Sequence, residues 1–122
     1  MVIDSSVFFE IFSDGPLRAA CEQQMRDKSL CVPTMVLFEI YRKIKVKVSE
    51  DEAMTAVGVM RSYNTLDLTS EVALLAADLS LEYSLPMADS FVLAHAFQLN
   101  QPLLTLDNDF ARIPGVIIIR KP

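Results

Sequence analysis

The sequence predicts an α/β fold in which helices cover both faces of a parallel sheet. Short apolar segments alternate along the chain with longer amphipathic segments, a pattern that is typical of a buried parallel sheet. The chain has 122 residues and contains no internal repeat, low-complexity tract or linker. We therefore expect a single domain over residues 1–122.

The N-terminal half predicts two strands and four helices. The turn residues Asp14, Gly15 and Pro16 end the first helix. Pro33 stops the second strand, so that Thr34 caps the helix after it. Ser49 precedes three consecutive acids, which complement the dipole of a helix start. The predicted segments are strands 1–4 and 29–32 and helices 5–13, 17–28, 34–47 and 49–61.

The C-terminal half predicts three further strands separated by helices. Thr69, Ser70 and Glu71 form a helix start, and Pro86 precedes a second apolar helix. Short apolar runs after residues 101 and 115 are consistent with buried strands. The predicted segments are strands 64–68, 102–105 and 116–119, helices 69–83 and 86–99, and a short helical turn over 108–111.

Composition excludes several classes of protein. A net charge of -5 and a pI near 4.7 disfavour a general nucleic-acid binder, which would be basic. No apolar run approaches the ~20 residues of a membrane span, and acids interrupt the only stretch that resembles a signal peptide. We therefore expect a cytoplasmic protein without membrane contact. Cys21 and Cys31 lack metal-ligand spacing and are expected to be reduced.

Four acids interrupt otherwise apolar segments: Asp4, Glu39, Asp89 and Asp107. A lone buried carboxylate is costly, which suggests that these acids converge on something cationic. Asp4 and Asp107 each follow a predicted strand, so they should meet at one edge of a parallel sheet. Glu39 and Asp89 lie on helices that begin after strand or proline turns and can reach the same edge.

A hard divalent cation such as Mg²⁺ or Mn²⁺ binds oxygen ligands of this kind. The site would activate water and stabilise the leaving oxygen of a phosphodiester. The sequence has neither a GxxxxGK[ST] nor a GxGxxG phosphate loop. His95, the single histidine, lies on a different helix face from Asp89 and is expected to be structural.

Basic residues gather directly after Glu39. Arg42 and Lys43 lie three and four positions beyond it and should project from the same helix face. Two interpretations remain open for them, a solvated face or contact with the phosphates of RNA. Lys45 and Lys47 would extend such a basic track.

Four motifs in order resemble PIN-domain ribonucleases, and among them the VapC-type toxins of toxin–antitoxin pairs. The motifs are VIDSSVF, PTMVLFEI, LPMADSFVLAHA and LLTLDNDF, and the resemblance covers essentially the whole chain. It implies a three-layer α/β/α sandwich with a parallel sheet of about five strands. It also implies a homodimer, Mg²⁺ or Mn²⁺ as cofactor, an RNA substrate and a cognate antitoxin.

The resemblance assigns roles to individual residues. Asp4, Glu39 and Asp89 match the three firmest acids of the family, and Asp107 matches the fourth. Three further residues match positions beside these acids. Asp109 could assist or replace Asp107 as a metal ligand. Ser6 stands where Asn is common in the family, and Thr105 places a hydroxyl against the fourth acid.

These residues favour a metal-dependent endoribonuclease toxin that cuts single-stranded or loop RNA and leaves a 5′-phosphate. A non-catalytic PIN-like binding or assembly module is an alternative, although such a module would be expected to lack one of the acids. An aspartyl-phosphate protein is a third interpretation. It is disfavoured because Asp4 is followed by Ser5 and Ser6 instead of a D-x-D motif.

Overall fold

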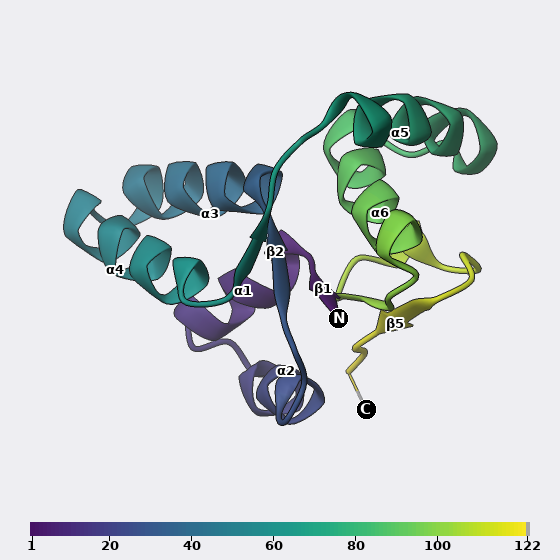
Figure 1. The fold of residues 1–122 in the computed structure, drawn as a ribbon. Helices are drawn as coiled ribbons and strands as arrows, with labels where there is room; N and C mark the ends of the chain where they lie inside the picture. Colours follow the sequence, from purple (N-terminus) through teal and green to yellow (C-terminus); the bar gives the residue numbers. More distant parts are fainter. Residues whose placement is uncertain (122) are drawn as a thin grey trace.

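The computed structural model describes residues 1–121 and contains one parallel sheet of five strands (Figure 1). Its strand order is β3-β2-β1-β4-β5, and every neighbouring pair is parallel. The α/β prediction is therefore confirmed. The strands are β1 (Val2–Ile3), β2 (Cys31–Pro33), β3 (Asn64–Leu66), β4 (Leu103–Thr105) and β5 (Val116–Ile118).

Helices cover both faces of this sheet and complete the three layers. Helices α1 to α4 lie on one side, and the packed pair α5 and α6 lies on the other (Figure 1). Right-handed crossovers require this arrangement, because the chain reverses its direction across the sheet after β3. The helices are α1 (Ser5–Phe12), α2 (Arg18–Met25), α3 (Thr34–Lys47), α4 (Glu50–Arg61), α5 (Ser70–Tyr83), α6 (Met87–Leu99) and the 3₁₀ turn η1 (Asn108–Phe110).

The reversal of strand order lies between β1 and β4, in the centre of the sheet. Val2 pairs with Leu103 and Ile3 with Leu104, and all four side chains are fully buried. Such continuous apolar strands are expected in a sheet that is covered on both faces. In parallel sheets of this type, ligands bind outside the carboxyl ends of the strands at this reversal.

The end of α2 and the capping of α3 differ from the sequence prediction. Helix α2 ends at Met25, short of residue 28, because Arg26 is extended and Asp27 is left-handed, with φ 63°. The prediction that Thr34 caps α3 is wrong. Pro33 holds the extended N-cap position, so Thr34 is already helical and its side chain caps nothing. Ser49 and Thr69 do cap α4 and α5 through their side-chain oxygens, as predicted.

The ends of β2 and β3 also differ from the prediction, those of β1 and β5 differ by one residue, and the sheet register explains the end of β3. Pro33 is the last residue of β2, since an extended proline is tolerated at a strand end. It pairs with Leu66, so Asp67 and Leu68 have no residue of β2 opposite them and β3 stops there. Over residues 1–121, no helix combines the length and the apolar character that a bilayer crossing would need.

Candidate active site at the centre of the sheet

The two predicted strand-end acids lie beside each other at the carboxyl edge of the sheet. Asp4 directly follows β1, and its backbone N–H donates to the carbonyl oxygen of Leu104 at 3.0 Å. Asp107 lies two residues after Thr105, the last residue of β4. The pairing of β1 with β4 therefore brings together residues from opposite ends of the sequence. Asp4 is only 4% exposed, while Asp107 is half-buried.

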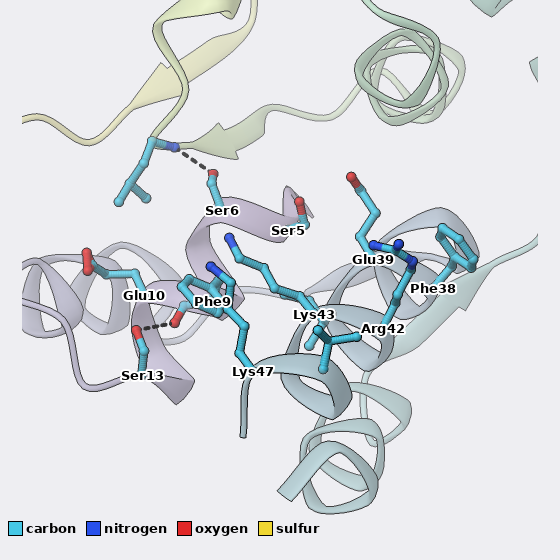
Figure 2. Close-up of a pocket in the computed structure, with 13 residues that line it drawn as sticks. Ser5, Ser6, Phe9, Glu10, Ser13, Phe38, Glu39, Arg42, Lys43 and Lys47 are labelled. Carbon is cyan, nitrogen blue, oxygen red and sulfur yellow. Dashed lines mark hydrogen bonds between the residues drawn. The ribbon is translucent and has the colours of Figure 1, made fainter. Parts of the chain in front are cut away.

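Two hydroxyl groups hold the Asp4 carboxylate. Thr105 Oγ1 donates to Asp4 Oδ2 at 2.7 Å, and Ser6 Oγ donates to the same oxygen at 2.8 Å. Each hydroxyl also accepts a backbone N–H at 3.0 Å: Thr105 accepts that of Asp107, and Ser6 accepts that of Leu106 (Figure 2). The hydroxyls thus connect Asp4 to the segment that follows β4.

The third and fourth carboxylates come from α6 and η1. Asp89 lies in the first turn of α6, on the opposite side of the sheet from α3. Asp107 caps η1 by accepting the backbone N–H of Asp109 at 2.9 Å. One carboxylate oxygen from each of Asp89, Asp107 and Asp109 lies within 4.8 Å of the others.

Burial and mutual repulsion change the acidity of these groups. Burial, and then the charges of Asp4, Asp107, Glu39 and Asp109, raise the pKa of Asp89 to about 7 from its ordinary value of 3.8. Burial and then the charge of Asp4 raise the pKa of Glu39, whereas the Ser5 hydroxyl and Lys43 oppose that shift. Five carboxyl groups therefore behave as one electrostatic cluster, here called the acidic cluster: Asp4, Glu39, Asp89, Asp107 and Asp109.

Asp4 is the most deeply buried member of the acidic cluster. Burial raises its pKa, Asp107 adds to the rise, and the hydrogen bonds from Thr105 and Ser6 oppose it. These hydroxyls, together with the backbone N–H of Ser5, favour the ionised form and so oppose the effect of burial, although the pKa of Asp4 still lies above its ordinary value.

The acidic cluster has the properties of a site for a hard divalent cation. Across residues 1–121, ion pairs are formed by Arg18 with Asp14 and Glu22 and by Lys45 with Glu50, all exposed, and none involves the cluster. The cluster offers carboxylate oxygens alone, and its negative charges repel one another. This donor set fits Mg²⁺ or Mn²⁺, which prefer oxygen ligands.

A groove of about 700 Å³ lies between α1 and α3, next to Glu39 (Figure 2). Its lining combines the aromatic side chains of Phe9 and Phe38 with the basic side chains of Arg42, Lys43 and Lys47. We call this the α1–α3 groove. The predicted projection of Arg42 and Lys43 from the face of Glu39 is therefore present in the structure.

Phe9 is a lining residue whose position the sequence did not reveal. Its ring lies 3.6 Å from Lys43 Nζ and 5.5 Å from Lys47 Nζ, measured to the ring centroid. Phe9 stands in an apolar run, which predicts a residue of the hydrophobic core. The helical spacing of Lys43 and Lys47 on α3 is the only sequence signal for its contact with these lysines. Ser5 lies beside Glu39, and the sequence did not reveal this either, because the contact joins α1 to α3.

One sequence-based prediction about contacts is wrong, and a second holds only for a backbone contact. Lys45 does not extend the basic track, because its Nζ donates to Tyr41 Oη at 3.2 Å and to Glu50 Oε1 at 3.3 Å, away from the groove. Thr105 contacts the fourth acid only through the backbone N–H of Asp107. Its own proton goes to the carboxylate of Asp4.

His95 is buried on α6, and burial lowers the pKa of its imidazole. It lies outside the acidic cluster and the α1–α3 groove. Cys21 is buried and Cys31 half-buried, and both are free thiols. These positions agree with the structural roles expected from the sequence.

The family model of the PIN domain matches residues 1–116. A comparison with curated proteins gives no match. Solved structures with a similar fold include a toxin–antitoxin complex from Klebsiella pneumoniae, with 24% identity, a TM-score of 0.79, and coverage of 95% of this chain and 94% of that chain.

Two further structures resemble this chain over almost its entire length. VapBC2 from Rickettsia felis, bound to a DNA fragment from its promoter, has 16% identity and a TM-score of 0.76, covering 97% of this chain and 96% of that one. VapC20 from Mycobacterium tuberculosis, a toxin that cleaves the sarcin-ricin loop, has 13% identity and a TM-score of 0.82, covering 98% of both chains. At these identities the similarity establishes the fold.

Proposed function

The chain belongs to the PIN domain family, and from this premise we propose that it is a metal-dependent endoribonuclease, the toxin of a toxin–antitoxin pair. The observation that supports this function best is the convergence of carboxylates at the centre of the sheet. Asp89, Asp107 and Asp109 offer oxygens within 4.8 Å of one another, and the pKa of Asp89 responds to all four other acids of the cluster.

Asp4, Glu39, Asp89 and Asp107 are the proposed catalytic and metal-binding residues, with Asp109 as a further ligand. A bound Mg²⁺ or Mn²⁺ ion supplies Lewis-acid chemistry, which polarises a phosphodiester and makes water a better nucleophile. The acids themselves hold the cation and, without it, repel the phosphates of RNA. A cation must therefore neutralise the acidic cluster before a substrate phosphate can approach these acids.

Single-stranded or loop RNA is the proposed substrate, and the α1–α3 groove supports this. Arg42 and Lys43 lie on the helix that carries Glu39, so phosphates bound to them would lie close to the acidic cluster. Phe38 is 62% exposed, which makes it available to stack on an unpaired base. This local basic surface compensates for the net charge of -5.

An antitoxin is the proposed protein partner. The similar structures from Klebsiella pneumoniae and Rickettsia felis are toxin–antitoxin assemblies. We propose that a segment of a cognate antitoxin occupies a groove beside the acidic cluster and places a basic side chain among the carboxylates, which would exclude both cation and RNA.

A homodimer and a cytoplasmic location complete the proposal. The start of α6 and the outer face of α5 expose large apolar side chains: Leu74 is 71%, Leu81 83% and Met87 70% exposed. A second copy of the chain would cover such side chains.

The proposed activity is tested by incubating the purified chain with a mixed panel of RNAs. The reactions contain Mg²⁺, Mn²⁺, Ca²⁺ or EDTA, and the ends of the products are mapped. We expect cleavage with Mg²⁺ or Mn²⁺, 5′-phosphates on the downstream fragments, and no cleavage in EDTA. Cleavage that persists in EDTA would contradict the metal requirement. Tight RNA binding without cleavage under any condition would favour a binding module.

A further inference from the structure

Two ammonium groups of α3 converge on one aromatic ring of α1. The Nζ atoms of Lys43 and Lys47 lie 3.6 Å and 5.5 Å from the centroid of the Phe9 ring. Figure 2 shows both side chains extending from α3 toward α1 and ending beside this ring. Residues four positions apart are neighbours on one helix face, so one ring is within reach of both. The lysines therefore direct two positive charges at one place instead of spreading them along the groove.

These two charges have no anionic partner within the protein. Across residues 1–121, neither Lys43 nor Lys47 takes part in an ion pair. Glu10 and Glu39 line the same groove, but neither carboxylate pairs with these lysines. Attraction to the aromatic face offsets part of the repulsion between the two ammonium groups. An anion that both groups contact would offset the rest.

Arg42 is directed elsewhere, although it precedes Lys43 in the sequence. Its guanidinium group lies on the side of Phe38, away from the ring of Phe9 (Figure 2). Successive residues of a helix project in directions about 100° apart, which explains this divergence. The basic residues of the α1–α3 groove therefore form two groups, the lysine pair at Phe9 and the single arginine beside Phe38.

We propose that Lys43 and Lys47 together bind one phosphate of the RNA backbone, on the platform that Phe9 provides. Arg42 then binds a different phosphate. This inference rests on the proposed RNA substrate. Each ammonium group has three N–H donors, and a backbone phosphate has two free oxygens, so one phosphate accepts hydrogen bonds from both lysines. Contact with the ring orders the ammonium groups before RNA arrives, which reduces the entropy lost on binding.

The test is a set of double-mutant cycles, in which two substitutions are made singly and together. Lys43→Met and Lys47→Met remove the ammonium groups but keep an unbranched apolar side chain against Phe9. Affinity for a labelled single-stranded oligouridylate is measured by fluorescence anisotropy at several salt concentrations. EDTA is present, so metal-dependent cleavage cannot interfere. Lys45→Met is the matched control, because Lys45 lies on the same helix and its ammonium group faces away from the groove.

We expect each single substitution at Lys43 or Lys47 to weaken binding only about twofold, because the remaining ammonium group keeps the phosphate. The double variant should bind about tenfold more weakly, which exceeds the product of the single effects and indicates a shared partner. Its salt slope should become shallower by about 0.7, the value for one phosphate of a single strand. Cycles that pair Lys43 with Arg42, or Lys47 with Lys45, should be additive.

Three outcomes would overturn this inference. If Lys43→Met and Lys47→Met act additively and each makes the slope shallower by about 0.7, the lysines bind two separate phosphates. If Lys45 and Lys47 are coupled as strongly as Lys43 and Lys47, net charge is responsible instead of a shared phosphate. A wild type that does not bind the oligouridylate in EDTA has no such phosphate site.

Failure of the inference differs from failure of the proposed function. Metal-dependent cleavage together with additive lysines leaves the endoribonuclease in place and overturns the shared phosphate. Coupled lysines in a chain that cleaves no RNA with Mg²⁺ or Mn²⁺ support the shared phosphate and contradict the endoribonuclease.

Discussion

The acidic cluster and the α1–α3 groove lie side by side, but their charges are stabilised in different ways. In the cluster, burial and the charges of neighbouring carboxylates raise the pKa of Asp4, Glu39 and Asp89. In the groove, the lysines lie over the ring of Phe9 and remain largely solvated. A bound cation would therefore favour ionisation of the cluster, whereas the basic side chains of the groove face solvent. Substitutions should affect chemistry in the first region and binding in the second.

The largest effect is expected from Asp89→Asn. This substitution keeps the shape of the side chain but removes one charge, so the cluster should hold a cation less tightly and RNA cleavage should fall by at least about 100-fold. The metal-free variant should be as stable as wild type or more stable at pH 8, because repulsion is relieved. Cleavage assays and thermal melts measure the two effects.

Asp67→Asn is the matched control for this substitution. Asp67 is exposed and follows β3 at the same edge of the sheet, so the control should cleave RNA like wild type. If Asp89→Asn instead melts several degrees lower and cleaves normally per folded molecule, Asp89 only stabilises the start of α6.

The groove should respond to removal of its charges by a loss of affinity. Changing Arg42 and Lys43 together to Ala should weaken RNA binding about tenfold at low salt. The slope of log K against log salt should become shallower by about one to two units. A double variant of Lys45 and Arg61, which are exposed and lie outside the groove, removes the same charge and serves as control. An equal effect of both double variants would mean that net charge, and not the groove, determines binding.

The pH dependence of stability should belong to the acidic cluster. The pKa of Asp89 is about 7 in the folded chain and ordinarily 3.8, so between these values the folded state binds more protons than the unfolded state. Stability must then fall as pH rises from about 4 to about 7. We expect the metal-free melting temperature to decrease by about 5 °C over this range.

Two comparisons identify the origin of that decrease. Millimolar Mg²⁺ should reverse it near neutral pH, since ligand binding stabilises the native state, and Asp89→Asn should reduce it. A melting temperature that rises over the same interval would contradict the assignment of the raised pKa to Asp89.

The smallest effect is expected from Phe9→Leu. The substitution keeps an apolar side chain but removes the ring beneath Lys43 and Lys47. A cation–π contact at a solvated site contributes about 0.5–1 kcal/mol, so RNA affinity should fall about two- to fivefold. The salt slope should stay unchanged, because the number of charges is the same. A change in slope would show that Phe9 influences which phosphates the lysines contact.

Much of the fold could be predicted from local sequence. The apolar runs that precede Asp4 and Leu106 indicated the two central strands. The caps of α4 and α5, at Ser49 and Thr69, were recognisable as well. The residue range of α3 was also predicted, but its capping was not, because the extended backbone of Pro33 holds the N-cap position and the Thr34 side chain caps nothing. The end of β3 depended on its register with β2, which is a property of two segments.

The acids of the candidate site were predicted because acids in apolar segments are conspicuous and parallel strands end at one edge. The contacts that surround these acids were harder to predict from the sequence. The shared acceptor of Ser6 and Thr105 depends on contacts across 99 residues, and the stacking of Lys43 on Phe9 depends on the packing of α1 against α3. Spacing along one helix placed Lys43 and Lys45 near each other, yet only the structure shows that they face different neighbours.

The pairing of β1 with β4 has a consequence for the chain while it is being synthesised. The first strand of the sheet obtains one of its two neighbours only after Leu103 and Leu104 have left the ribosome. Until then the emerging chain contains Asp4, Glu39 and Asp89, but neither Thr105 nor Asp107 is available to complete the cluster. Contacts of such long sequence separation form late in folding. A nuclease built in this way would be inactive until the segment after β4 has been synthesised and has paired with β1.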